Sequence, residues 1–529
     1  MNYKRNYMRT NKIVTVIAAI LFAVAMNSCK KILDVAPYTS FSDVTAFSSP
    51  ERCALALNGV YDAAQSGFYA GNVIRGYPFG AANIEQADMR GEDMLNQATF
   101  YQVTHESTYN PTTANNVYMW QTLYALINTA NLTIEGVRDA VSKGIITEAV
   151  ANQYEAECRF LRAMAHHELV INFSRPFADG NGDKLGIMYR DFGINNDATV
   201  AAAKEQHRET VADNYTKILA DLDYSESNLP INGDIKTYRA SKAAAIAMKM
   251  RVRMHMGDWA NVITEGNKLV PAAAPFISPI GNWRMMATAD GPFLNNQSDE
   301  SIFSVKNDAN DNPGTNAALA RMLGSPALNG RGLVRVSPIA FNLQTWMCDD
   351  LRRGLLMTQD GRSYYTTKYR DYTNWTDASP QIRYAEVLLI LSEAEARTAS
   401  GVSSRAVTLL NAVRNRALAS PAAAYTVGSF ANKNALIQAI LDERRIEFLA
   451  EGKRWGDLHR LAVDPTFSAG GIPAKMAFAN ATFVTYNCNT NPPLTKAIVF
   501  IPYADFRYLW PIPLEEIQQN PNVEQNPGY

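Results

Sequence analysis

The chain has 529 residues, with 50 Lys and Arg against 51 Asp and Glu, and 47% of its residues are hydrophobic. This length suffices for a sizeable core or for several packed lobes. Four basic residues and no acidic one lie in the first 28 positions, so the remainder carries 46 basic and 51 acidic groups, a balance of −5. That balance argues against nucleic acid as a partner, which requires a basic face, and against a basic membrane-binding patch.

The first 28 residues have the pattern of an export signal. Residues 13–26 are mostly apolar and follow a basic start, and this run is shorter than the roughly 20 residues that span a bilayer. Two cleavage patterns are present. Ala23 and Ala25 form an A-x-A pattern, whereas Ser28 directly before Cys29 is typical of a signal whose cysteine becomes lipidated. These residues favour lipidation, which would anchor the chain to a membrane.

The segment after this signal is rich in Ser, Thr and Pro, and we expect a tether over 29–48. A helix is predicted to begin at Pro50, with Ser49 as its cap. Residues 66–116 are rich in Gly, Asn and Tyr and show no sustained period. We therefore expect long, aromatic-rich loops there, a type of segment that is often functional.

Helices dominate the middle of the chain. Apolar residues recur at helical spacing in 115–141, 147–173, 208–228 and 239–270. Two helix pairs, one turning at Gly257 and one turning at Gly401 within 382–418, show the small and large positions of tetratricopeptide repeats. A single helix pair cannot bury its own face, so such units stack. Residues 271–380 are irregular, with one predicted strand over 301–306. The predicted fold is mostly α, with tetratricopeptide-like helix pairs, long irregular loop insertions and a little β.

Catalytic and metal motifs are missing from the sequence. It contains no H-E-x-x-H, G-x-S-x-G or P-loop pattern. His166 and His167 are adjacent on a predicted helix, so they point about 100° apart and cannot share one metal. Residues 307–314 hold enough side-chain oxygens to permit a Ca²⁺ but lack the spacing of a calcium loop. We predict no catalytic residue, no metal site and no cofactor.

The cysteines suggest neither a zinc site nor a redox motif. They lie at 29, 53, 158, 348 and 488 and form no C-x-x-C pair. Their spacing differs from that of a small secreted disulfide scaffold. We therefore expect most of those after Cys29 to be buried free thiols, including Cys158 in a helix core.

The densest charged helix is predicted within 441–461. Glu443 and Glu447 lie one turn apart, with Arg444 and Arg445 beside them. Paired carboxylates can perform glycosidase chemistry. Carboxylates on one helix face among arginines are more typical of a structural, ion-paired face.

Aromatic side chains in polar loops are the better functional candidates. Flat rings stack on the C–H faces of sugars, while neighbouring Asn, Asp and Arg bond the hydroxyls; a peptide could use the same surfaces. The alternative is that these rings pin the loops to the scaffold, as we expect for the core residues Trp120 and Trp346. The candidate ligand-binding residues are Tyr69, Tyr77, Arg90, Tyr101, Trp283, Tyr372 and Trp375.

Several stretches together resemble the SusD/RagB-like outer-membrane nutrient-binding lipoproteins. They are 29–37, 156–177, 382–397 with 409–417, 440–460 and 509–529. The resemblance covers nearly all of the chain after the signal. It implies lipidation at Cys29 and a mostly α-helical, tetratricopeptide-type fold. It also implies a non-catalytic surface protein that binds oligosaccharides and delivers them to a SusC-like TonB-dependent outer-membrane transporter.

The expected organisation is a lipoprotein signal peptide over 1–28, a tether over 29–48 and a single domain over 49–529, with parts 49–270 and 271–529. The expected location is the outer membrane, lipid-anchored and facing the exterior. Three other functions stay open: a peptide- or glycopeptide-binding subunit of such a transporter, a glycoside hydrolase, and a scaffold that gates the transporter and binds nothing itself.

Overall fold

The computed structural model describes residues 45–68, 73–231 and 237–529. The predicted signal peptide, most of the predicted tether, Cys29 and Tyr69 lie outside these residues. The first half of the described chain contains α2 (Pro50–Gln65), α3 (Ala81–Arg90), α4 (Gln102–His105), α5 (Ala114–Ser142), α6 (Glu148–Phe173), α7 (Asp197–Lys204), α8 (Val211–Asn228), α9 (Lys242–Met256) and α10 (Trp259–Leu269). The second half contains α11 (Gly291–Leu294), α12 (Leu319–Leu323), α13 (Pro338–Phe341), α14 (Arg352–Leu355), α15 (Tyr384–Thr398), α16 (Ser404–Arg414), α17 (Lys433–Glu447), α18 (Arg454–Arg460) and α19 (Leu514–Gln519).

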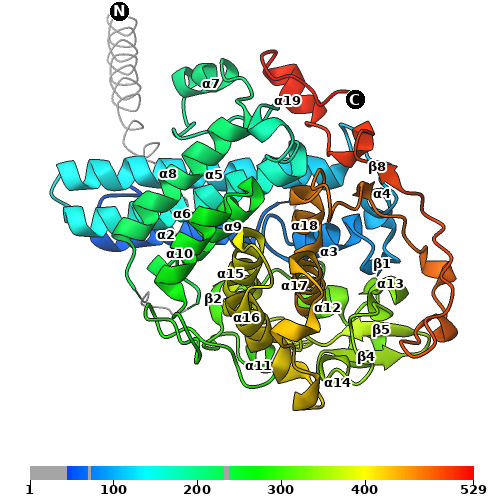
Figure 1. The fold of residues 1–529 in the computed structure, drawn as a ribbon. Coiled ribbons are helices and arrows are strands. Elements are labelled where there is room, and N and C mark those ends of the chain that lie inside the picture. Colours follow the sequence, from blue (N-terminus) through cyan, green and yellow to red (C-terminus); the bar gives the residue numbers. More distant parts are fainter. Residues whose placement is uncertain (1–44, 69–72, 232–236) are drawn as a thin grey trace, which may run out of the picture.

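The long helices form the scaffold that the periodicity predicts. α5 packs against α6 and α6 against α8, and these three lie together in the upper half of Figure 1. α2 begins at Pro50, and the Ser49 side chain accepts a hydrogen bond from the Arg52 N–H, as the cap prediction requires. None of the helices in the described ranges combines the length and apolarity needed to cross a membrane.

Both predicted helix pairs are confirmed. α9 and α10 pack together across Gly257, whose φ of 71° is the left-handed conformation that glycine adopts readily. α15 and α16 form the second pair, and α10 packs against α15, so the two pairs stack. This stacking contributes to a large hydrophobic core whose members run from Leu57 to Val523, so residues of both expected parts share it.

The prediction of long loops over 66–116 is wrong in part. This region contains α3 and α4, and also β1, which pairs with β3. α3 is buried on nearly every side, including the polar residues Glu85, Gln86 and Asp88. A helix surrounded by protein has no solvent face, so its sequence lacks the amphipathic period by which helices are predicted.

Strands are few and pair only in twos. The described strands are β1 (Met94–Asn96), β2 (Ser301–Val305), β3 (Val334–Val336), β4 (Met357–Asp360), β5 (Ser363–Thr366), β6 (Ser379–Arg383), β7 (Gly471–Ile472) and β8 (Ile501–Pro502). The pairs β1–β3, β2–β6, β4–β5 and β7–β8 are all antiparallel. β2 confirms the strand predicted at 301–306.

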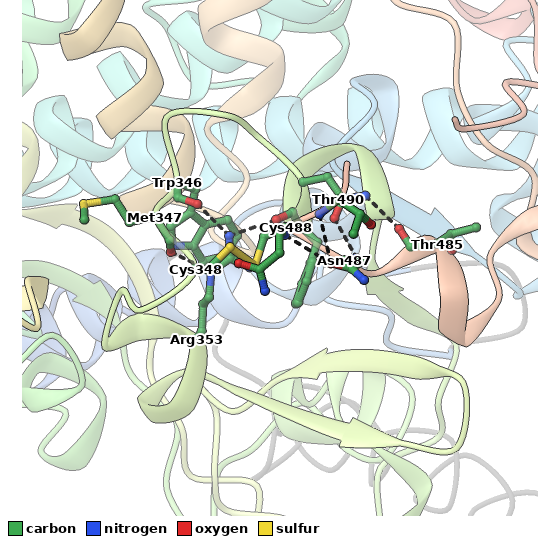
Figure 2. Close-up of a disulfide and its surroundings, with 11 residues drawn as sticks. Trp346, Met347, Cys348, Arg353, Thr485, Asn487, Cys488 and Thr490 are labelled. Carbon is green, nitrogen blue, oxygen red and sulfur yellow. Dashed lines mark hydrogen bonds between the residues drawn. A yellow bond between two sulfur atoms is a disulfide. The ribbon is translucent and has the colours of Figure 1, made fainter. Parts of the chain in front are cut away.

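The expectation that most of the cysteines after Cys29 are free thiols is wrong, because two of the four form a disulfide. Cys348 is bonded to Cys488 across 140 residues, whereas Cys53 and Cys158 are buried free thiols, as predicted for Cys158. Figure 2 shows the bond beside Trp346 and Arg353. Trp346 is buried as expected, but it lies in a turn, with the Arg353 guanidinium 4.2 Å from its ring centroid. Pairing over such a separation leaves no local trace in the sequence.

Candidate functional site

Four of the predicted ligand-binding residues are buried and belong to the scaffold. Tyr77, Arg90, Tyr101 and Trp283 are each at most 1% exposed. The Arg90 guanidinium lies 3.4 Å from the Trp455 ring centroid and donates to Asn172 Oδ1 at 2.6 Å. Rings and guanidinium groups enclosed in this way present no face to a ligand. The three rings are therefore part of the scaffold, as in the alternative interpretation, and Arg90 is buried in the same scaffold.

Tyr372 and Trp375 differ, because both rings are partly exposed on one loop. Two carboxylates hold this loop. Asp377 accepts the backbone N–H groups of Arg370 and Asp371, at 3.0 and 2.8 Å. Asp371 accepts the N–H groups of the three residues Thr373, Asn374 and Thr376, and also the Thr376 hydroxyl.

The electrostatics of this loop favour one fixed conformation. Burial raises the pKa of Asp371, but hydrogen bonds from the Thr376 side chain and from neighbouring backbone N–H groups lower it by a larger amount. The pKa of Asp371 is therefore below its usual value. Trp375 has a φ of 61°, which is uncommon for a bulky residue. Backbone strain of this kind persists only where the surroundings impose it, and it clusters at functional sites. The loop is therefore rigid and presents its rings in a set arrangement.

Tyr372 packs against a glycine. A Cβ placed on Gly324 would lie 2.5 Å from a ring carbon of Tyr372, so a larger residue there would displace the ring. Gly324 follows α12, which carries Arg321, and Arg331 lies in the loop further along the chain. Arg331 donates to Asn316 Oδ1 at 2.8 Å, and Arg321 donates to the backbone oxygen of Asn329. The arginine that affects Tyr372 itself is Arg370, whose charge opposes in part the rise that burial causes in the pKa of the Tyr372 hydroxyl.

Hydrogen bonds join this loop to the end of α2. Asn307 Nδ2 donates to the Asp377 backbone oxygen at 2.7 Å, and Gln65 Nε2 donates to Asn307 Oδ1 at 2.9 Å. We call the surface formed by residues 306–316, 321–331 and 370–377 the loop face. It brings together segments that are far apart in sequence.

A pocket of about 250 Å³ opens beside the Gln65 end of the loop face. We call it the α2 pocket. Its lining combines two tyrosines with charged and amide side chains: Asn58, Tyr61, Asp62, Gln65, Tyr238, Arg239, Val305, Lys306 and Asp311. The helix residues of this pocket, Asn58, Tyr61, Asp62 and Gln65, are not candidates from the sequence, because that helix is predicted as scaffold.

A cation–π contact involves Arg75, which acts electrostatically on the same buried acid, Glu85, as Arg331 of the loop face. The Arg75 guanidinium lies 4.2 Å from the Phe100 ring centroid. Both Arg75 and Arg331 act electrostatically on Glu85, which is fully buried. Burial raises the pKa of Glu85 from 4.5 to about 8, and Tyr101, Arg331 and Arg75 oppose this shift only in part. The Glu85 side chain is therefore a buried neutral acid at pH 7.

A larger open groove of about 640 Å³ lies between residues 274–285 and α16. Its walls include Phe276, Ile277 and Met285, with Asn411 and Asn415 from the helix side. This groove contains none of the predicted ligand-binding residues, and Trp283, which directly precedes its lining residues Arg284 and Met285, is buried. The loop face is therefore the better candidate.

Glu443 and Glu447 form buried ion pairs, which confirms the structural interpretation, although their partners differ from those expected. Arg352 donates to Glu443 at 2.6 Å and to Glu447 at 3.1 Å. Glu447 also pairs with Arg383 and Arg416. The flanking Arg444 and Arg445 pair elsewhere, with Asp457 and Asp93. Carboxylates bound to arginines on several sides are poorly suited to proton transfer.

The described residues contain no group of three or more His, Cys, Asp or Glu side chains placed to hold a metal ion. In the 307–314 segment, Asp308 Oδ1 accepts the N–H groups of Asn310 and Asp311, and its other oxygen pairs with Lys306. This carboxylate stabilises the turn itself.

Two family models match complementary parts of the chain. The SusD family model matches residues 351–529, and a model described as starch-binding, associating with the outer membrane, matches residues 31–254. SusD-like protein P2 of Formosa agariphila is 26% identical over 456 residues, which cover 78% of this chain and 80% of that protein.

Solved structures share the fold. A SusD superfamily protein from Bacteroides fragilis superposes with a TM-score of 0.72 at 24% identity, covering 90% of this chain and all of that one. Surface glycan-binding protein A from Bacteroides uniformis superposes with a TM-score of 0.67 at 19% identity, covering 90% of this chain and 99% of that one. With its stacked helix pairs and the two family models that together span most of its length, this chain belongs to the SusD family of proteins that associate with the outer membrane.

Proposed function

We propose that this protein captures oligosaccharides at its loop face and delivers them to a TonB-dependent outer-membrane transporter, without chemical change to the sugar. The observation that carries the proposal is the rigid loop that holds Tyr372 and Trp375. Both residues are partly exposed, while the Tyr372 hydroxyl and the Trp375 indole nitrogen are themselves buried, so the proposal relies on the ring faces and not on these polar atoms. Aromatic faces on a loop that also carries Arg370 and the exposed Asn374 suit the alternating C–H faces and hydroxyls of a sugar chain.

The comparisons support a sugar ligand. One family model is described as starch-binding, and one structural neighbour is named a surface glycan-binding protein. In the proposal, Cys29 carries the lipid that anchors the protein to the outer membrane, facing the exterior. The Cys348–Cys488 disulfide agrees with a location outside the reducing cytoplasm.

The test is calorimetric titration of the chain from residue 30 onward with neutral plant, host and microbial oligosaccharides, followed by product analysis of each mixture. We expect saturable binding by at least one neutral oligosaccharide and unchanged sugar after incubation. Cleavage would replace the proposal with a glycoside hydrolase. Binding of peptides alone would make the protein a peptide-binding subunit, and no binding of either class would favour a gating scaffold.

The anchor and the partner are tested in cells of a native host. We expect wild-type protein to incorporate labelled fatty acid and to co-purify with a TonB-dependent transporter, and the Cys29→Ala variant to lose the label. Surface proteolysis of intact cells measures orientation. Labelled Cys29→Ala protein, or wild type protected from external protease, would contradict the corresponding part of the proposal.

A further inference from the structure

Two carboxylates of the α2 pocket have no cationic partner among the residues that the structure describes. Asp62 and Asp311 line the pocket, and neither forms an ion pair with another described residue. They are close enough to affect each other, since burial raises the pKa of Asp62 and the charge of Asp311 raises it further. Like charges held together in this way are destabilising unless a cation lies between or beside them.

The cations that line the pocket are already engaged. Arg239 donates to Glu157 through Nε at 2.5 Å and Nη2 at 3.0 Å, and Glu157 is 1% exposed. Lys306 pairs with Asp308 at 2.6 Å. Each positive charge is therefore neutralised by its own acid. Among the described residues of the pocket, the uncompensated charge is that of Asp62 and Asp311, which is negative.

The aromatic wall of the pocket also suits a cation. The Arg239 guanidinium lies 4.9 Å from the Tyr61 ring centroid, so one ring of the pocket already accepts a positive group. Tyr238 is 91% buried and lines the pocket, and its hydroxyl forms no hydrogen bond with the described residues. This hydroxyl is a hydrogen-bond acceptor available to a ligand N–H.

We infer that the α2 pocket is a subsite for one positively charged amino-sugar unit. Its ammonium group pairs with Asp62 and Asp311 and donates a hydrogen bond to the Tyr238 hydroxyl oxygen. This inference rests on the proposed function, because it assumes that the ligand on the adjoining loop face is an oligosaccharide. The pocket, at about 250 Å³, is smaller than the roughly 300–1,000 Å³ of sites for drug-sized ligands, and so it matches a single sugar unit.

The probes are glucosamine oligosaccharides and their fully N-acetylated counterparts of equal length, titrated into the chain from residue 30 onward at a pH where the amine is protonated. We expect the free-amine oligomers to bind about tenfold more tightly at low salt, the effect of two solvent-accessible ion pairs of up to about 1 kcal/mol each. This preference should decrease as salt screens the charges.

The variant Asp62→Asn/Asp311→Asn keeps the shape of the pocket and removes its charge. We expect it to bind both oligomers equally, and to bind the N-acetylated one as wild type does. Asp349→Asn, which changes an exposed acid outside the pocket, is the control and should keep the preference. Thermal unfolding of each variant checks that it folds.

Equal binding of both oligomers by wild type, or a preference that persists in the double variant, would overturn the inference. So would stronger competition by lysine-containing peptides than by glucosamine oligomers. The neutral panel described above separates the two proposals. If neutral oligosaccharides bind and the amine gives no advantage, only the subsite fails; if no sugar of either kind binds, the proposed function fails with it.

Discussion

Trp283 and Trp375 show how one side chain takes opposite roles in this protein. Trp283 is 1% exposed and its backbone oxygen accepts the Ser278 N–H at 2.8 Å, so it anchors the irregular 271–300 segment. Trp375 is partly exposed on the loop held by Asp371 and Asp377. Both lie in Gly- and Asn-rich sequence, and only their surroundings distinguish them.

Trp283→Ala and Trp375→Ala should therefore have different effects. Trp283→Ala removes a buried ring, and we expect the free energy of unfolding to decrease by about 3–5 kcal/mol. Trp375→Ala removes a stacking face, and we expect up to about tenfold weaker oligosaccharide binding, with a much smaller effect on stability. Denaturant unfolding and calorimetry measure the two quantities. Wild-type affinity in both Trp375→Ala and Tyr372→Ala would rule out the loop face as the site.

Glu85 should make stability depend on pH. Its pKa is raised from 4.5 to about 8 by burial, so the folded protein retains a proton that the unfolded chain loses above pH 4.5. The stability contributed by the neutral acid is present below about pH 4.5 and is lost as pH rises toward 8.

Glu85→Gln carries no such proton, so its stability relative to wild type should increase with pH. Between pH 5 and pH 8 we expect this difference to grow by about 3–4 kcal/mol, at 1.36 kcal/mol per pKa unit. Denaturant unfolding of both proteins at the two values measures it. A difference that stays constant from pH 5 to pH 8 would show that folding does not raise the pKa of Glu85.

At the scale of elements, α17 is held to the rest of the fold by buried charge. Glu443 and Glu447 on α17 pair with Arg352 from α14, and Glu447 also pairs with Arg383 at the end of β6. Asp350 adds a further bond to Arg352 at 2.7 Å. The ion pairs therefore link three elements instead of stabilising a single helix. The stability of such a network depends on every partner, because the loss of one charge leaves the others buried and unpaired.

Arg352→Met tests this dependence. It leaves Glu443 and Asp350 without their arginine, and we expect the free energy of unfolding to fall by about 3–5 kcal/mol. Arg352→Lys keeps the charge but not the planar fork, so its loss should be smaller. Denaturant midpoints rank the two variants against wild type. A Met variant as stable as wild type would show that the network contributes no net stability.

At the scale of the molecule, hydrogen bonds and a disulfide join segments that are far apart in the sequence. Trp120 of α5 donates to Glu516 of α19 at 3.1 Å, and Arg208 donates to Asn526 Oδ1 at 2.9 Å. The Cys348–Cys488 disulfide closes a further long connection, and Asn342 Nδ2 donates to the Thr485 backbone oxygen beside it at 2.7 Å. Figure 1 shows the C-terminal segment, in orange and red, running along the outside of the fold.

Cys348→Ser/Cys488→Ser should lower the free energy of unfolding by about 2–5 kcal/mol, because the closed loop spans 140 residues and restricts the unfolded chain. Reduction of the wild type should reproduce this change, and reductant should not affect the double variant. Matched unfolding curves for oxidised wild type and the double variant would show that the bond does not stabilise the fold.

Sequence alone determined the helical scaffold, both helix pairs, the β2 strand and the resemblance to the SusD family. These features depend on residues close together along the chain, such as Ser49 before Pro50 and Gly257 between two helices. Tertiary structure alone decided which aromatic residues face solvent and which arginines pair with Glu447. It also decided that Cys348 bonds to Cys488 and that Asp62 of α2 lines the same pocket as Asp311. Burial and pairing depend on which distant segments pack together, and local composition does not encode that. This is why Tyr77, Arg90, Tyr101 and Trp283 resembled ligand-binding residues in the sequence and are core residues in the fold.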